Sequence, residues 1–215
     1  MLPSGVGVLT YGFLFLTCVL WFTALILPSW FVFSMKFEKS KILYMDEARI
    51  GLLYNNECRQ GSCWQVSHSD DNRPYSSLMP AMLELQIESI SALLFCSASF
   101  VLLLFTQKGS TKFSSTRFVS TAVLILPIAY ILEIILIIRA TLAYKEMSIA
   151  FKRLEVIIPL KVEMKFPYCL LVSGIGTIFA FLGWVSCIYL HRKFRESHNR
   201  NKDQVTATSN NESHT

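Results

Sequence analysis

The chain has 215 residues, a hydrophobic content of 53% and a formal net charge of +5 at pH 7. Its apolar residues are gathered into four long blocks, each able to cross a bilayer core of about 30 Å as a helix. Because these blocks are apolar on all sides, a soluble protein could not cover them, so the composition indicates an integral protein of the lipid bilayer. The sequence has no nucleic-acid-binding motif, and we expect no nucleic-acid partner.

The first apolar block spans residues 8–33 and contains no charged residue. A cleaved signal peptide would have a basic start and a short apolar core, whereas the first basic residue here is Lys36. We therefore expect a membrane helix that stays in the protein. It ends near Trp30, an aromatic residue suited to the lipid headgroup region.

The segment 34–84 is the first predicted outer loop. Short runs rich in β-branched and aromatic residues, separated by charged and turn-forming residues, predict roughly three to five β-strands in it. The loop also contains Cys58 and Cys63, which are the only cysteines outside the apolar blocks. A disulfide, half of a metal site and two free thiols are the three interpretations, and the side of the membrane decides among them.

The second and third apolar blocks span residues 85–106 and 118–143 and contain Glu88, Glu133 and Arg139. A charge in hydrocarbon costs about 2.5–3.5 kcal/mol on insertion scales, so these residues are candidates for function. An ion pair of Glu88 with Arg139 is one interpretation; the other has Arg139 reaching the headgroups and Glu88 facing outer water. Glu133, the deepest of the three, suits an ion pathway, a contact with a partner helix, or a hydrogen bond within the bundle.

The segment 144–166 is the second predicted outer loop, and residues 167–190 form the fourth apolar block. Apolar and charged residues alternate from Leu160 to Met164. A period of two is typical of a half-buried strand, so we expect this loop to add a strand to the sheet of the first loop.

Small residues spaced four apart in the fourth block let helix backbones approach closely. They are Ser173 with Thr177 and Gly176 with Ala180. We expect them to pack within the bundle rather than to form an oligomer interface. Cys187, near the cytoplasmic end, is either an S-acylation site or a buried residue that packs like a small apolar side chain.

Basic residues set the predicted orientation. The loop between the second and third blocks carries three and the tail 191–215 carries five, over 36 positions, while the outer loops hold eleven among ten acidic residues over 74 positions. The positive-inside rule then places both termini in the cytoplasm. We expect the protein in the plasma membrane or the secretory pathway. The tail is polar and rich in Ser, Thr and Asn, and we expect it to be disordered.

With the termini inside, the first outer loop faces an oxidising compartment, where thiols form disulfides. Cys58 and Cys63 have no other outer cysteine to pair with, and Gly61 between them supports a tight turn, so we expect a Cys58–Cys63 disulfide. A zinc site would need two more ligands, which His68 alone does not supply, and we expect no metal.

In this four-span layout, the first span ends at Trp30, and the first outer loop then contains Gly51-Leu52 followed by the close pair Cys58 and Cys63. The layout resembles the superfamily of claudins, peripheral myelin and epithelial membrane proteins, and the gamma-type auxiliary subunits of calcium channels and glutamate receptors. The resemblance implies the same outer sheet and disulfide. Leu53 stands where the claudin motif has a second Trp, and only four residues separate the cysteines, which favours a divergent member over a true claudin.

The predicted fold is therefore an all-α transmembrane four-helix bundle with a small extracytoplasmic antiparallel β-sheet, in which residues 1–190 form one membrane domain. The sequence has no catalytic motif, and we expect neither an enzyme nor a cofactor. The resemblance implies an auxiliary or scaffolding subunit that binds a membrane-protein partner in the same membrane, or self-association. Cell–cell adhesion at junctions is the alternative, and an ion pathway through the chain itself has the least support.

Overall fold

The computed structural model describes residues 4–39, 42–59, 62–66, 82–108, 112–157 and 160–212. His68, considered above as a metal ligand, lies outside these residues. Four helices within the described part are long and apolar enough to span a membrane, which supports an integral membrane protein. They are α1 (Ser4–Ile26), α2 (Met82–Lys108), α3 (Lys112–Ile157) and α4 (Tyr168–Glu212).

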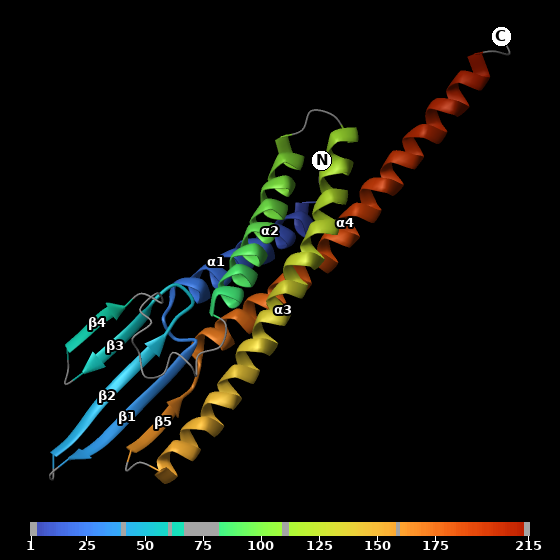
Figure 1. Cartoon of the computed structure of the whole chain (residues 1–215). Coiled ribbons are helices and arrows are strands. Elements are labelled where there is room, and N and C mark those ends of the chain that lie inside the picture. The colour runs from blue at the N-terminus through green and yellow to red at the C-terminus, as the bar shows by residue number, and fades with distance from the viewer. Residues whose placement is uncertain are drawn as a thin grey trace.

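The four helices form one bundle, and a small β-sheet lies at one end of it (Figure 1). α1 begins and α4 ends at the other end of the bundle, away from the sheet. An even number of spans produces this arrangement, because each crossing reverses the direction of the chain. The predicted combination of a four-helix bundle and a small antiparallel sheet is confirmed; the side of the membrane on which the sheet lies stays a prediction.

The sheet has five antiparallel strands in the order β4-β3-β2-β1-β5. The strand predicted in the second outer loop pairs with the first strand of the first loop, Phe33 lying opposite Met164. A distant segment thus completes the sheet, as the alternation of residues indicated. The strands are β1 (Phe31–Lys39), β2 (Ile42–Ile50), β3 (Asn55–Arg59), β4 (Ser62–Val66) and β5 (Leu160–Lys165).

The first span is shorter than the apolar block 8–33 that predicted it. α1 ends at Ile26, and the apolar residues from Phe31 onward belong to β1. The reason is Pro28, since a proline and the residue before it disfavour a continuing helix. From Trp30, whose backbone N–H donates to the carbonyl of Ile50 at 3.0 Å, the chain bonds to the sheet instead.

Two other helices extend far beyond their predicted spans. α3 continues past the predicted span end at residue 143 to Ile157, so most of the second outer loop is helical. Its apolar residues continue at helical spacing there, and Ala143, Met147 and Phe151 are buried against the sheet. α4 continues to Glu212, where we expected a disordered tail. The segment 191–212 has neither Gly nor Pro, so no residue in it interrupts the helix.

One face of the sheet is apolar and packs on the bundle. Alternate residues of β1 and β2, including Phe31, Phe33, Ala48 and Ile50, are buried in a cluster that also contains residues of all four helices. The rings of Phe33 and Phe151 lie with their centroids 5.2 Å apart. The hydrophobic core therefore runs continuously from the helices into the sheet. The opposite face of the sheet points away from the bundle.

Candidate functional site

The motif residues Trp30, Gly51 and Leu52 join the sheet to the bundle. Trp30 is fully buried, and its Nε1 donates to the carbonyl of Ala24 at the end of α1, at 2.7 Å. Leu52 is also fully buried, and its carbonyl accepts from Nε2 of Gln86 on α2, at 2.5 Å. These residues carried the family resemblance, and in the structure they act as architecture rather than as an exposed binding site.

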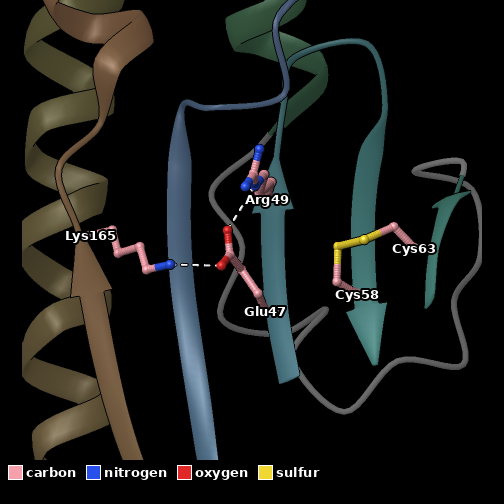
Figure 2. Close-up of a disulfide and its surroundings, with 5 residues drawn as sticks. All are labelled: Glu47, Arg49, Cys58, Cys63 and Lys165. Carbon is pink, nitrogen blue, oxygen red and sulfur yellow. Dashed lines mark hydrogen bonds and ion pairs between the residues drawn. A yellow bond between two sulfur atoms is a disulfide. The ribbon is translucent and has the colours of Figure 1, made fainter. Parts of the chain in front are cut away.

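Cys58 and Cys63 form a disulfide, as predicted. They lie directly opposite each other on β3 and β4, so the bridge closes the hairpin at the edge of the sheet (Figure 2). A half metal site and two free thiols are both excluded by this bond. Among the described residues, no group of three or more His, Cys, Asp or Glu side chains is placed to hold a metal ion.

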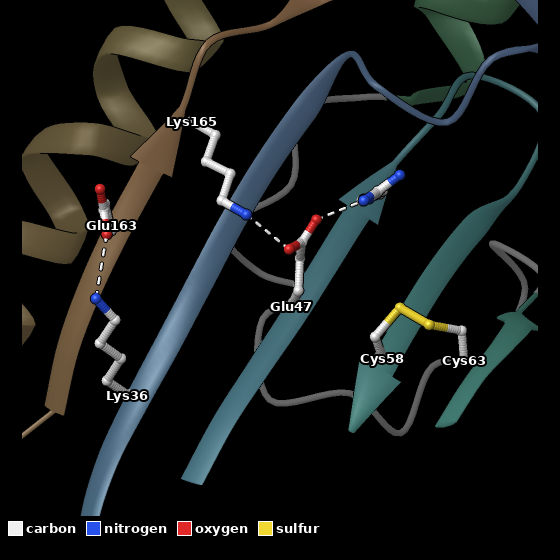
Figure 3. Close-up of polar contacts among 7 residues, drawn as sticks. Lys36, Glu47, Cys58, Cys63, Glu163 and Lys165 are labelled. Atoms are coloured by element: carbon white, nitrogen blue, oxygen red, sulfur yellow. Dashed lines mark hydrogen bonds and ion pairs between the residues drawn. A yellow bond between two sulfur atoms is a disulfide. The ribbon is translucent and has the colours of Figure 1, made fainter. Parts of the chain in front are cut away.

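The outward face of the sheet carries ordered charges, and we call it the polar face: Lys36, Glu47, Arg49, Glu163 and Lys165, with the disulfide beside them. Glu47 on β2 binds Nζ of Lys165 on β5 at 2.6 Å and Nε of Arg49 at 2.7 Å. Because β1 lies between β2 and β5, the Lys165–Glu47 pair reaches across it (Figure 3). Lys36 and Glu163 form a second pair, at 3.4 Å.

These ion pairs favour the charged form of Glu47. The hydrogen bond from Lys165 lowers the pKa of Glu47 below its ordinary value of 4.5, Arg49 adds to this effect, and partial burial opposes it. The polar face therefore keeps a fixed negative charge between two positive ones at neutral pH. Each pair is partly open to solvent, so its contribution to stability is on the order of 1 kcal/mol or less.

The polar face could not be recognised from the sequence. The alternation around Glu163 marked β5 as a strand, but the partners of its charges lie on β1 and β2, far away in the sequence. The pairing depends on the strand order and register. The only sign of this face in the sequence is that charged residues stand two apart within a strand, which places their side chains on the same side of the sheet.

Of the two interpretations of Glu88 and Arg139, the structure contains the ion pair, which joins α2 to α3. Arg139 also binds Glu84, which the sequence analysis had placed in the outer loop. Glu88 is the more enclosed carboxylate, with 16% of its side chain exposed against 58% for Glu84. Arg139 therefore binds two carboxylates at the sheet end of the bundle instead of reaching the headgroups alone.

Glu133 lies inside the bundle, with only 1% of its surface exposed. Its Oε1 accepts a hydrogen bond of 2.5 Å from the hydroxyl of Ser173 on α4. Among the described residues, its Oε2 has no hydrogen-bond partner. Of the three interpretations of Glu133, the hydrogen bond within the bundle is the one that the structure contains. Ser173, which we expected only to allow close packing, supplies it.

The small residues of α4 are buried within the bundle, and Gly176 packs against α1. A methyl group on Gly176 would lie 2.6 Å from Cδ1 of Trp21, so only glycine fits there. Ala180 is buried in the same part of the bundle, and Thr177 bonds back to the carbonyl of Ser173. Cys187 is fully buried in this cluster as well. S-acylation needs an accessible sulfur, so the structure favours the alternative in which Cys187 packs as a small apolar side chain.

No family model matches the chain, and no characterised protein matches it in sequence. The resemblance to the claudin-type superfamily therefore stays a prediction that rests on the residues quoted above.

Proposed function

We propose that this chain is a non-enzymatic membrane protein that acts through protein–protein contacts, as an auxiliary or scaffolding subunit of a channel, receptor or other partner in the same membrane. The polar face is the observation that carries this proposal. The bundle covers the apolar side chains of β1 and β2, so the polar face of β1, β2 and β5 is a charged surface that the sheet offers to another protein. The resemblance to families that include such subunits supports the same conclusion.

The polar face is organised before any partner binds. Its backbone is held from behind by the Phe33–Phe151 contact and from the side by the disulfide, and its charges are held by the ion pairs of Glu47. A surface that is already ordered loses little conformational entropy on binding, which favours affinity. Fixed charges of both signs favour specificity, because a partner must present the complementary pattern.

In this proposal the sheet lies on the extracytoplasmic side and both termini are cytoplasmic. Two observations support this orientation. The Cys58–Cys63 disulfide is stable in an oxidising compartment, and the denser basic residues lie in the loop and tail at the opposite end of the bundle. The orientation can be tested by labelling Lys161, an exposed residue of β5, on intact cells with a reagent that does not cross the membrane.

The main test is affinity purification from native membranes in a mild detergent, followed by mass spectrometry. We expect the wild type to recover a channel, receptor or other membrane protein in stoichiometric amount. Arg49→Glu reverses an exposed charge of the polar face and should remove that partner. Lys152→Glu, a matched reversal at an exposed position of α3, should retain it.

One result would contradict the polar face as the binding surface, and another would contradict the auxiliary role. Equal recovery of the partner by wild type and Arg49→Glu would show that the polar face is not the binding surface. Recovery of only the chain itself and junctional proteins, together with adhesion between cells that express it, would instead support the adhesion role in apposed membranes.

A further inference from the structure

Two free cysteines touch each other inside the helix bundle. Cys18 of α1 and Cys96 of α2 have their sulfur atoms 3.6 Å apart, and the hydroxyl oxygen of Ser97 lies 3.8 Å from the sulfur of Cys18. The other two free cysteines are differently placed. Cys169 donates to the carbonyl of Leu27 at 3.4 Å, and Cys187 lies buried among apolar residues. Cys18 and Cys96 are thus a thiol pair formed by two helices.

The two thiols differ in their access to lipid. Cys18 is half-buried, and its helical neighbours Phe15 and Phe22 are exposed on the outside of the bundle. Cys96 is only 1% exposed and lies behind it. A lipid-soluble reagent therefore meets Cys18 first, with Cys96 in position to react next. An accessible cysteine backed by a second, resolving cysteine is the arrangement found in thiol redox sensors.

We propose that Cys18 and Cys96 form a redox-responsive site that lipid hydroperoxides oxidise to a second disulfide, which links α1 to α2. A lipid hydroperoxide is the oxidant that suits this position, because it dissolves in the hydrocarbon that surrounds Cys18. This inference is independent of the proposed partner binding, since it concerns the interior of the bundle rather than the polar face.

The reaction has two steps. The sulfur of Cys18 attacks the terminal oxygen of the hydroperoxide, the O–O bond breaks, and the thiol proton passes to the leaving alkoxide. The products are a lipid alcohol and a sulfenic acid on Cys18. The sulfur of Cys96 then attacks that of Cys18, the S–OH bond breaks, and hydroxide leaves with the proton of Cys96 as water. Two thiols thereby supply the two electrons that reduce the peroxide.

The geometry allows this bond with a small movement. Closing the sulfur–sulfur distance from 3.6 Å to the bonded distance of about 2.05 Å requires a change of about 1.5 Å, shared between two side chains. Residues 18 and 96 are 78 positions apart, and β1 to β4 lie between them in the chain. Oxidation would therefore close a long loop that contains most of the sheet, which should raise the unfolding midpoint of the protein.

The test uses the full-length protein in phospholipid vesicles treated with a fatty-acid hydroperoxide. After denaturation, free thiols are counted by maleimide labelling and intact mass. The wild type has four free cysteines, and the number of free thiols should fall from four to two after peroxide treatment. Cys18→Ser and Cys96→Ser should each lose no thiol to a disulfide. Cys169→Ala is the matched control, which keeps the pair and should still lose two.

A second measurement keeps the test valid if a variant fails to fold. Mass spectrometry of non-reduced digests of the oxidised wild type should identify a peptide pair joined through Cys18 and Cys96. A lipid-anchored dithiol in the same vesicles shows that the peroxide is active. Retention of all four thiols while that dithiol is oxidised would overturn the proposal. So would a product that stops at the sulfenic acid, or a crosslink through Cys169 or Cys187.

Discussion

At the scale of single residues, the turn at Gly51 has no room for a side chain. A methyl group there would lie 2.7 Å from both the Cα of Pro28 and the carbonyl oxygen of Tyr54, which are backbone atoms that move only with the chain. We expect Gly51→Ala to lower the free energy of unfolding by about 1–3 kcal/mol, the usual cost of overpacking. Thermal unfolding in detergent measures it.

The control for this prediction is Gly174→Ala. Nothing lies within 4 Å of a methyl group at that position of α4. Alanine is the better helix former, so this change should be neutral or slightly stabilising. An unfolding midpoint for Gly51→Ala equal to that of the wild type would show that the turn can shift without cost.

Glu133 provides the second prediction at this scale. Ser173→Ala removes the one hydrogen-bond donor that Glu133 has among the described residues and leaves a buried carboxyl group unsatisfied, which costs about 1–3 kcal/mol. Glu133→Gln keeps a side-chain oxygen that can accept from Ser173 while removing the carboxyl group, so it should destabilise less. Unfolding midpoints of both single variants and the double variant test this. If Ser173→Ala lost no stability, the hydrogen bond would have no structural role.

At the scale of elements, the ion pairs across β2, β1 and β5 make the sheet sensitive to acid. Lys165 and Arg49 hold the pKa of Glu47 below 4.5 in the folded protein. Stability from these pairs is therefore complete above the unfolded pKa and is lost as the pH falls through the lower, folded pKa. We expect Glu47→Gln to lower the unfolding midpoint at neutral pH, and this difference to shrink as the pH falls below about 4.5.

Glu163→Gln is the control on the same face. Its pair with Lys36 is longer, at 3.4 Å, and the side chain of Glu163 is 65% exposed. At neutral pH, Glu163→Gln should lower the unfolding midpoint less than Glu47→Gln does, because exposed ion pairs contribute little to stability. A midpoint difference between wild type and Glu47→Gln that stays constant on acidification would contradict the role assigned to Lys165 and Arg49.

At the scale of the whole molecule, the sheet and the bundle share one hydrophobic core, and α3 extends beyond the other helices to support the sheet. Phe151→Ala removes the ring that packs on Phe33 and should cost about 3 kcal/mol or more. Because the loss lies at the junction, hydrogen exchange should increase in β1 and β5 more than in the middle of α1. Ile149→Ala, at an exposed position of the same helix, should change neither the free energy of unfolding nor the hydrogen exchange of the sheet.

An equal increase in exchange throughout the protein after Phe151→Ala would show that the sheet does not open separately from the bundle. Exchange that is unchanged everywhere would show that the Phe33–Phe151 contact carries no stability. Either result would also weaken the proposed function, which depends on α3 holding the polar face in position.

The sequence by itself determined the features that depend on local chemistry. Unbroken apolar blocks have to be helices in a membrane, because the backbone must satisfy its own hydrogen bonds there. Period-two alternation around Val162 identified a strand, and two outer cysteines close in sequence identified a disulfide. The pair of Glu88 and Arg139 was one of two interpretations of charges at similar depth, and the sequence did not decide between them.

Only the tertiary structure decided where elements end and which distant residues meet. Met147 and Phe151 continue the helical spacing of α3, but only the structure shows that the sheet covers them. The ion pairs of Glu47 and the contact of Cys18 with Cys96 depend on strand register and helix rotation. A shift of one residue in a strand turns every side chain to the other face, so a polar face exists only once the register is set by the whole core.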